Sequence, residues 1–266
     1  MATNDENNLA TENTEKKDFI TQNNALGNDG LSKVISDAWH NTKVIWVIYK
    51  PMVQLLISIN DLFMKYVEVF KTLSKESDIS SPAALLARAY GCYLASVRLS
   101  TSGQLSESSV MFRACIETAL YGYYINRKPE LSKIWTERHK NLETKKKVRN
   151  EFKIDNILKE LAGQEPKISS WIKNEYEKTI DFGGHPNVYS VAINWRDTGE
   201  NEVIDIFNND PYNQKNFLLT NICFGLSCLS VFRLIYPQQL EEIGVPKELK
   251  ELFDKLKELS QSVIEK

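Results

Sequence analysis

The sequence predicts a mainly α-helical fold, a multi-helix bundle with one small β-hairpin. Apolar residues recur at helical spacing in several long stretches, as they do at Leu55, Ile59, Leu62 and Tyr66. Prolines fall at the starts of such stretches, where a helix tolerates them. One stretch, at about residues 188–207, instead has two strand-like runs around a turn. We therefore expect about six to eight helices around one hydrophobic core.

Length and composition fit one main domain with appendages. The chain has 266 residues, of which 42% are hydrophobic, and this is enough to bury a sizeable core. Residues 1–30 are rich in Asn, Thr, Asp and Glu and are expected to form a disordered tail. The helical bundle domain is expected over residues 31–245, with a C-terminal amphipathic helix over residues 246–266. The net charge of −2 offers no overall attraction for nucleic acid or anionic membrane.

Cysteine usage and the first residues predict a cytoplasmic protein. Cys92, Cys115, Cys223 and Cys228 lie in apolar helical stretches without a CxxC pair, and we expect reduced core thiols. The first 17 residues lack the basic and apolar regions of a signal peptide. No cofactor and no metal ion is predicted. No membrane contact is expected, because the uncharged run 217–232 is shorter than the roughly 20 residues that a span needs. A membrane-contacting helix remains the alternative.

The N-terminal half of the bundle is expected to hold four helices. A short one covers 31–39, and a longer one carries Pro51 in its first turn and ends at about Leu73. Ser81 and Pro82 are an N-cap and a first helical residue, and Gly103 ends that helix after Ser102. One face of it has small residues around Gly91, which predicts close packing by the next helix, 105–126.

The second half is expected to hold a charged helix at about 130–150, a helix at 168–181, the hairpin, and an apolar helix at 211–236. Strands are predicted at 188–195 and 203–207 around a turn at Asp197 to Gly199. The charged helix carries the basic run Lys145, Lys146, Lys147 and Arg149. This run indicates either a solvated face with i,i+4 ion pairs or an RNA contact.

The last helix begins at about Pro246 and has an apolar seam at alternating three- and four-residue spacing: Leu249, Leu252, Leu256, Leu259 and Val263. Two interpretations stay open for this seam. The helix either docks on its own domain or provides a surface for self-association.

A polar stripe interrupts the otherwise apolar helix at 105–126, and it consists of Ser106, Ser109, Arg113, Glu117 and Tyr124. A helix that is apolar on most sides is buried, and a buried charge has to be paired. Arg113 and Glu117 are therefore either a structural ion pair, completed by the serines and Arg88, or a site. In a site, the guanidinium would hold a phosphate or carboxylate and the carboxylate would act as a base.

The second candidate is His185-Pro186-Asn187, which follows a glycine pair after a helix with Tyr176. Pro186 keeps His185 out of the helical region, so the imidazole is expected at a fixed corner. A structural or capping role is the alternative. His40 and His139 lie in polar surroundings and are expected at the surface.

These motifs carry a family resemblance over residues 81–236. The run Ser106, Ser109, Arg113, Glu117, followed by His185-Pro186-Asn187, a hairpin and an apolar helix, resembles uncharacterised prokaryotic helical proteins. Those look like relatives of the HEPN helical-bundle group. The resemblance implies ribonucleases of toxin or antiviral systems, whose active helix carries an arginine followed four to six residues later by a histidine. This sequence departs from that pattern at all three of its histidines.

Two functions are therefore predicted. The first is a non-catalytic interaction or ligand-binding domain, either monomeric or dimeric, in a prokaryotic stress or defence system. The second is a metal-independent ribonuclease or hydrolase in which His185 acts with Arg113, Glu117 and Asn187, while the basic run guides nucleic acid.

Overall fold

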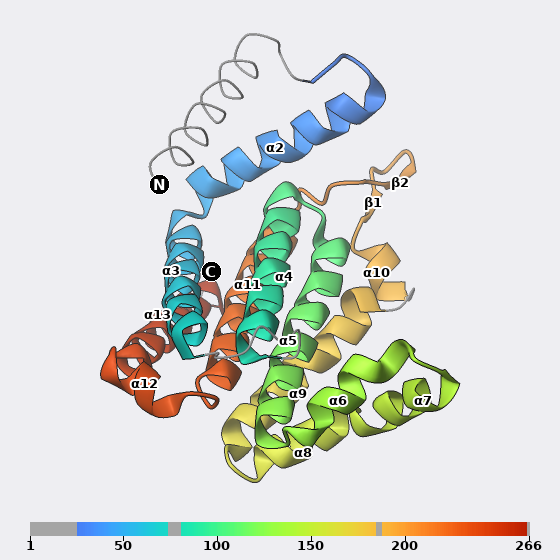
Figure 1. Cartoon of the computed structure of the whole chain (residues 1–266). Helices are drawn as coiled ribbons and strands as arrows, with labels where there is room; N and C mark the ends of the chain where they lie inside the picture. The colour runs from blue at the N-terminus through green and yellow to red at the C-terminus, as the bar shows by residue number, and fades with distance from the viewer. Residues whose placement is uncertain (1–25, 74–80, 185–187, 265–266) are drawn as a thin grey trace, which may run out of the picture.

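A computed structural model describes residues 26–73, 81–184 and 188–264 of the chain. Helices dominate these residues, and the sheet found in them has two antiparallel strands (Figure 1). The predicted fold class, a mainly α-helical bundle with a small hairpin, is confirmed. The predicted disordered tail falls almost entirely outside the described residues.

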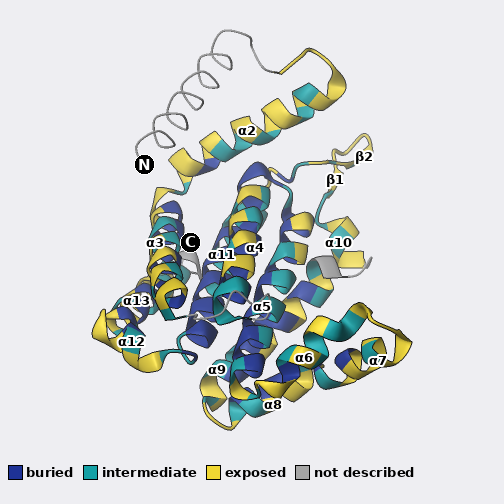
Figure 2. Cartoon of the chain, in the orientation of Figure 1, coloured by how far each residue is buried: buried dark blue, intermediate teal, exposed yellow. Residues whose placement is uncertain are grey.

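Four long helices form the core of the bundle: α3 (Lys50–Leu73), α4 (Pro82–Ser102), α5 (Leu105–Arg127) and α11 (Pro211–Phe232). Helix α11 packs against the other three, and most of its second half is buried (Figure 2). Phe112 of α5 stacks on Phe224 of α11 with ring centroids 4.4 Å apart. The Tyr66 hydroxyl of α3 donates to the Leu229 carbonyl oxygen at 3.0 Å, so the core helices are joined by polar as well as apolar contacts.

Helix α11 is long and apolar enough to cross a membrane, yet 72% of its most apolar stretch is buried inside the bundle. Its buried Asn221 is satisfied within the protein, because its side-chain oxygen accepts from Ser96 at 3.0 Å and its amide donates to Ser100 and to the Phe217 carbonyl oxygen. The position of α11 in the core therefore accounts for its composition, as the sequence predicted.

Helix α4 begins and ends as predicted. The Ser81 hydroxyl caps it by accepting from the Ala84 amide at 3.2 Å, and Gly103 ends it in the left-handed region with φ of 93°. Its main neighbour is α5, also as predicted. The predicted contact face is wrong, however, because Gly91 is exposed and has open space beside it. The two helices meet through Ala89 instead, whose carbonyl oxygen accepts from the Cys115 thiol at 3.2 Å.

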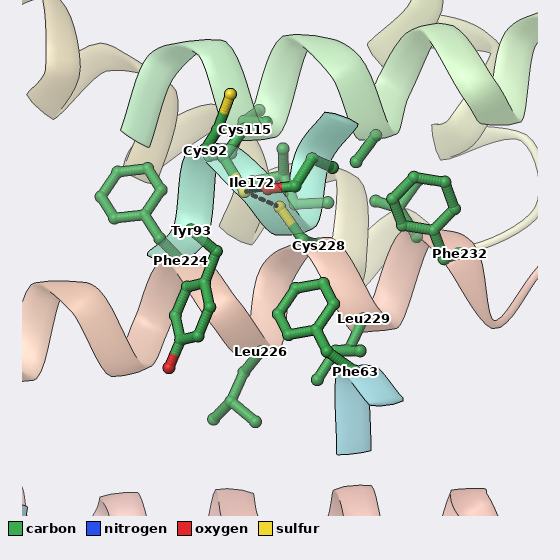
Figure 3. Close-up of a cluster of buried hydrophobic side chains, with 14 of the residues drawn as sticks. Phe63, Cys92, Tyr93, Cys115, Ile172, Phe224, Leu226, Cys228, Leu229 and Phe232 are labelled. Carbon is green, nitrogen blue, oxygen red and sulfur yellow. Dashed lines mark hydrogen bonds between the residues drawn. The ribbon is translucent and has the colours of Figure 1, made fainter. Parts of the chain in front are cut away.

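All four cysteines are free thiols, and Cys92, Cys115 and Cys228 are buried together between α4, α5 and α11 (Figure 3). The sulfurs of Cys115 and Cys228 lie 3.1 Å apart. The hydrogen bond to Cys228 and burial raise the pKa of Cys115 well above its usual value, so this thiol is a poor nucleophile. All three cysteines are buried and pack as core side chains.

Helix α2 (Gly30–Ile48) is longer than the predicted 31–39 segment and meets α3 at an angle of 102°. The chain turns at Tyr49, whose amide still donates to the Ile45 carbonyl oxygen at 2.9 Å. Pro51 follows directly and lies in the first turn of α3, as predicted. Helix α2 therefore lies across the end of the bundle (Figure 1).

Short helices cover one side of α5: α6 (Glu130–Thr136), η1 (Glu137–His139), α7 (Leu142–Glu151), α8 (Ile154–Ala162), α9 (Pro166–Thr179) and the π-helical turn η2 (Ile180–Gly184). The single charged helix predicted at 130–150 is wrong, because Asn141 starts a new helix there. Asn141 and Thr144 form a reciprocal capping box that satisfies the first amides of α7.

The hairpin is shorter than predicted. Residues Val188–Ala192 form helix α10, and the strands are β1 (Trp195–Asp197) and β2 (Glu202–Ile204). Val188, Tyr189 and Val191 are mostly exposed, so no buried sheet face stabilises an extended form of that segment. The turn itself is as predicted: Gly199 has φ of 82°, and the Asp197 carboxylate accepts from its amide at 2.7 Å.

After α11, which ends at Phe232 rather than at the predicted Tyr236, a short helix α12 (Pro237–Glu242) leads to α13 (Val245–Ile264). Four leucines of the predicted seam pack against the core of the same chain: Leu249, Leu252, Leu256 and Leu259. The side chain of Val263 lies outside the described ones. Helix α13 is thereby docked on α3 and α11.

Candidate functional site

The polar stripe of α5 contains an ion pair that ties this helix to α9. Arg113 donates from Nε to Oε1 of Glu117 at 2.8 Å, one helical turn along α5. The hydroxyl of Tyr176 donates to the same oxygen at 2.9 Å. We call these three residues the α5–α9 clasp. It is about one-third exposed at its charged members, and it joins residues that lie 59 positions apart in sequence.

Tyr176 holds both members of the ion pair. The Arg113 guanidinium lies over its ring, 5.3 Å from the centroid, so one aromatic side chain meets the cation and the anion together. Burial and the negative charge of Glu117 raise the pKa of Tyr176 to about 12. Burial opposes the charge on Arg113, but the hydrogen bond with Glu117 prevails and its pKa is raised. At neutral pH Arg113 is therefore charged, and the Tyr176 hydroxyl keeps the proton that it donates to Glu117.

The other members of the stripe do not complete the clasp. Ser106 donates to the Ser190 carbonyl oxygen at 2.9 Å, and Ser109 donates to the Leu105 carbonyl oxygen. Tyr124 donates to Glu151 of α7 at 2.9 Å. Within the described residues, Arg88 forms no ion pair with Glu117. The predicted ion pair is therefore present, but the serines have other partners and Arg88 does not join the pair in the described part of the chain.

A groove of about 420 Å³ lies beside the clasp, between α4, α5 and α6. It is lined by Ala84, Leu85, Arg88, Ala114, Glu117, Thr118, Tyr121 and Trp135. Both hydrogen bonds of the clasp fall on Oε1 of Glu117, so in the described part of the chain Oε2 stays available to a ligand. Arg88 brings the opposite charge to the same groove.

His185 and Asn187, the other predicted site residues, lie outside the described residues together with Pro186. A catalytic role for His185 and Asn187 stays a prediction. His40 and His139 are exposed, as the sequence predicted.

Glu175 of α9 is a buried carboxylate that sequence reasoning missed. Its Oε1 accepts from the Lys178 ammonium at 2.7 Å. Its Oε2 is buried without a hydrogen-bond partner among the described residues. Nothing in the sequence indicates this burial, because a glutamate three residues before a lysine has the spacing of an ordinary surface ion pair.

The basic run Lys145, Lys146, Lys147 and Arg149 is exposed on α7. The predicted pairs of Lys147 with Glu143 and with Glu151 are absent from the described ion pairs, and Glu151 accepts from Tyr124 instead. An RNA contact by this run stays a prediction.

The described side chains include no group of three or more His, Cys, Asp or Glu residues arranged to hold a metal ion. No protein-family model, curated protein or solved structure matches the chain.

Proposed function

We propose that the chain is a non-catalytic helical domain that binds a small zwitterionic ligand in the groove between α4, α5 and α6. The supporting observation is that Arg88 and Glu117 bring opposite charges to one apolar groove. Its volume of about 420 Å³ falls within the range of about 300–1,000 Å³ that is usual for small-molecule sites.

The charges of the groove suit a ligand that carries a carboxylate and an amine. Arg88 is exposed and free of ion pairs within the described residues, so its planar fork can accept a carboxylate. Oε2 of Glu117 can accept a hydrogen bond from an ammonium group. The clasp supports this role, because Arg113 and Tyr176 hold the Glu117 side chain in place before a ligand arrives.

The rest of the groove suits an apolar body. Ala84, Leu85 and Ala114 line it with aliphatic surface, and Tyr121 and Trp135 contribute aromatic rings. The Tyr121 ring packs on Phe152 and its hydroxyl donates to the Phe152 carbonyl oxygen at 3.3 Å. A fixed ring of this kind favours a flat apolar group, such as a phenyl ring.

The composition of the groove supports binding rather than catalysis. Among the described lining residues there is no cysteine, serine or histidine to act as a nucleophile or proton carrier. The Thr118 hydroxyl donates to the Ala114 carbonyl oxygen at 2.6 Å and points back to its own helix. Glu117 and Arg113 are engaged with each other.

Calorimetric titration with three probes tests this proposal. Phenylalanine carries both charges, phenylpropionate lacks the amine and phenylethylamine lacks the carboxylate. We expect phenylalanine to bind tightest, with each missing charge weakening binding about fivefold, since a charged hydrogen bond at a half-exposed site contributes about 1 kcal/mol.

Arg88→Gln should weaken phenylalanine binding by a similar factor. Arg98→Gln is the matched control, because Arg98 is exposed on the same helix and lies outside the groove lining. No binding of any probe, or equal binding by the two variants, contradicts the proposed function.

A further inference from the structure

Helix α2 exposes an apolar stripe that the rest of the described chain leaves uncovered. Leu31, Ile35, Trp39 and Trp46 follow one another at spacings of four, four and seven residues, so they lie on one face. Their side chains are between 47% and 70% exposed. The adjoining face docks on the bundle through buried Ile45. Helix α2 is therefore apolar over a wider arc than its own fold buries.

The hairpin carries more exposed apolar side chains at the same end of the molecule (Figure 1). Trp195, Ile204 and Ile206 are at least half exposed. Between them and α2 runs a groove of about 830 Å³, which reaches from Val34 and Asp37 of α2 to the segment before α11. The apolar stripe and the groove lie on the two flanks of the docked face of α2, and together with the hairpin we call them the α2–hairpin surface.

We propose that the α2–hairpin surface is the interface between two copies of this chain. A two-fold axis would place the α2 stripe of each copy against the groove of the other. Such an interface must carry both complementary halves on each copy, and the stripe and the groove are two such halves. The seam leucines of α13, the other apolar stripe of the sequence, already pack inside their own bundle.

The exposed area is of the size that a stable dimer needs. A large apolar side chain carries roughly 150–250 Å² of surface, so the seven residues of the stripe and hairpin leave on the order of 900 Å² in water. A standard interface covers about 800 Å² on each partner.

Charge favours a second copy over a lipid surface. Asp37, Asp205 and Asp210 all line the groove, and Arg196 neutralises only Asp205. The remaining carboxylates would repel an anionic membrane. Helix α2 carries the complementary charge, because Lys33 and Lys43 are exposed and the Lys43 ammonium lies 5.5 Å from the Trp39 ring centroid. In a two-fold pair, these lysines would face the acidic groove of the other copy.

Sedimentation equilibrium of the full chain tests this inference. The wild type should show a mass of two chains, and Leu31→Lys/Ile35→Lys should show a mass of one. Leu142→Lys/Ile243→Lys is the matched control, because these residues are 77% and 45% exposed and lie away from the α2–hairpin surface. The control should keep the mass of two chains, and circular dichroism should show unchanged helicity for both variants.

Three outcomes overturn the inference. The first is a dimeric Leu31→Lys/Ile35→Lys variant. The second is a monomeric wild type that pellets with vesicles of phosphatidylcholine and phosphatidylserine, which would make lipid the occupant of the surface. The third is a monomeric wild type that ignores vesicles and whose tryptophan emission resists acrylamide quenching, which would make residues 1–25 the cover.

Discussion

At the scale of single residues, the α5–α9 clasp shows what spacing can and cannot reveal. Arg113 and Glu117 are four positions apart on one helix, so their pairing was predictable from the sequence. Tyr176, which donates to the same carboxylate oxygen, lies on another helix and has no local signature. The interpretation as a structural pair depends on that third residue, because it ties the carboxylate to a second helix.

Tyr176→Phe should lower the free energy of unfolding by about 1 kcal/mol, because it removes one hydrogen bond to a partly exposed carboxylate and keeps the ring. Urea unfolding of Tyr176→Phe, Glu117→Gln and the double variant measures the coupling between them. Tyr212→Phe, at an exposed position, should leave stability unchanged. Additive effects of Tyr176→Phe and Glu117→Gln would show that the clasp does not act as a unit.

The alternative ribonuclease hypothesis has its own test at this scale. If Glu117 serves binding and structure, the purified wild type, His185→Ala and Glu117→Gln should all leave a fluorescently labelled RNA intact. A mock purification from the same host is the control for contaminating nucleases. RNA cleavage by the wild type that both variants abolish would establish the enzyme and refute the non-catalytic proposal.

At the scale of elements, the sequence predicted which helices are neighbours better than which faces meet. Small residues on α4 indicated close packing around Gly91, but that glycine faces open space. The close approach occurs at Gly225 of α11, where an added Cβ would lie 2.7 Å from Ile59 and 2.8 Å from Tyr93. A glycine allows another helix to approach closely at any position. Whether a helix does so depends on how the whole helix that carries the glycine is buried.

Gly225→Ala and Gly91→Ala should therefore change stability in opposite directions. Gly225→Ala inserts a methyl group into filled space and should destabilise the protein by about 1–3 kcal/mol. Gly91→Ala removes a flexible residue from an exposed helix position and should stabilise it by about 0.5–1 kcal/mol. Urea unfolding curves measure both. A neutral Gly225→Ala would mean that α11 does not lie against Ile59 and Tyr93 as described.

At the scale of the whole molecule, apolar periodicity and the placement of proline and glycine were enough to predict the bundle. Pro82 and Pro211 mark the starts of α4 and α11, and Gly103 marks the end of α4. The prediction of a strand at 188–195 was wrong. Alternation of apolar and polar residues within a short segment does not show whether another part of the chain will cover its apolar face. The exposure of the apolar stripe on α2 was not predictable either, because such a stripe has the same sequence pattern whether its own fold or another chain covers it.

Buried tyrosines predict an alkaline limit to stability. Burial raises the pKa of Tyr66, Tyr93 and Tyr176, the last to about 12, whereas the unfolded chain ionises its tyrosines at about 10. Because the folded state favours the protonated form of these tyrosines, their contribution to stability is complete below pH 10. This contribution is lost as the pH rises toward 12. Urea midpoints should hold steady up to about pH 9 and then fall, in step with tyrosinate absorbance at higher pH. Constant midpoints up to pH 12 would contradict the burial described for these hydroxyls.

The central proposal, a ligand in the groove beside Glu117, is tested most directly by methyl NMR spectra recorded during a titration with phenylalanine. The methyl signals of Ala84 and Ala114, which line the groove, should shift in a saturable manner, while those of Ala162 and Ala192, which lie outside its lining, should stay in place. Unchanged spectra, or shifts confined to residues outside the groove, would contradict the proposal.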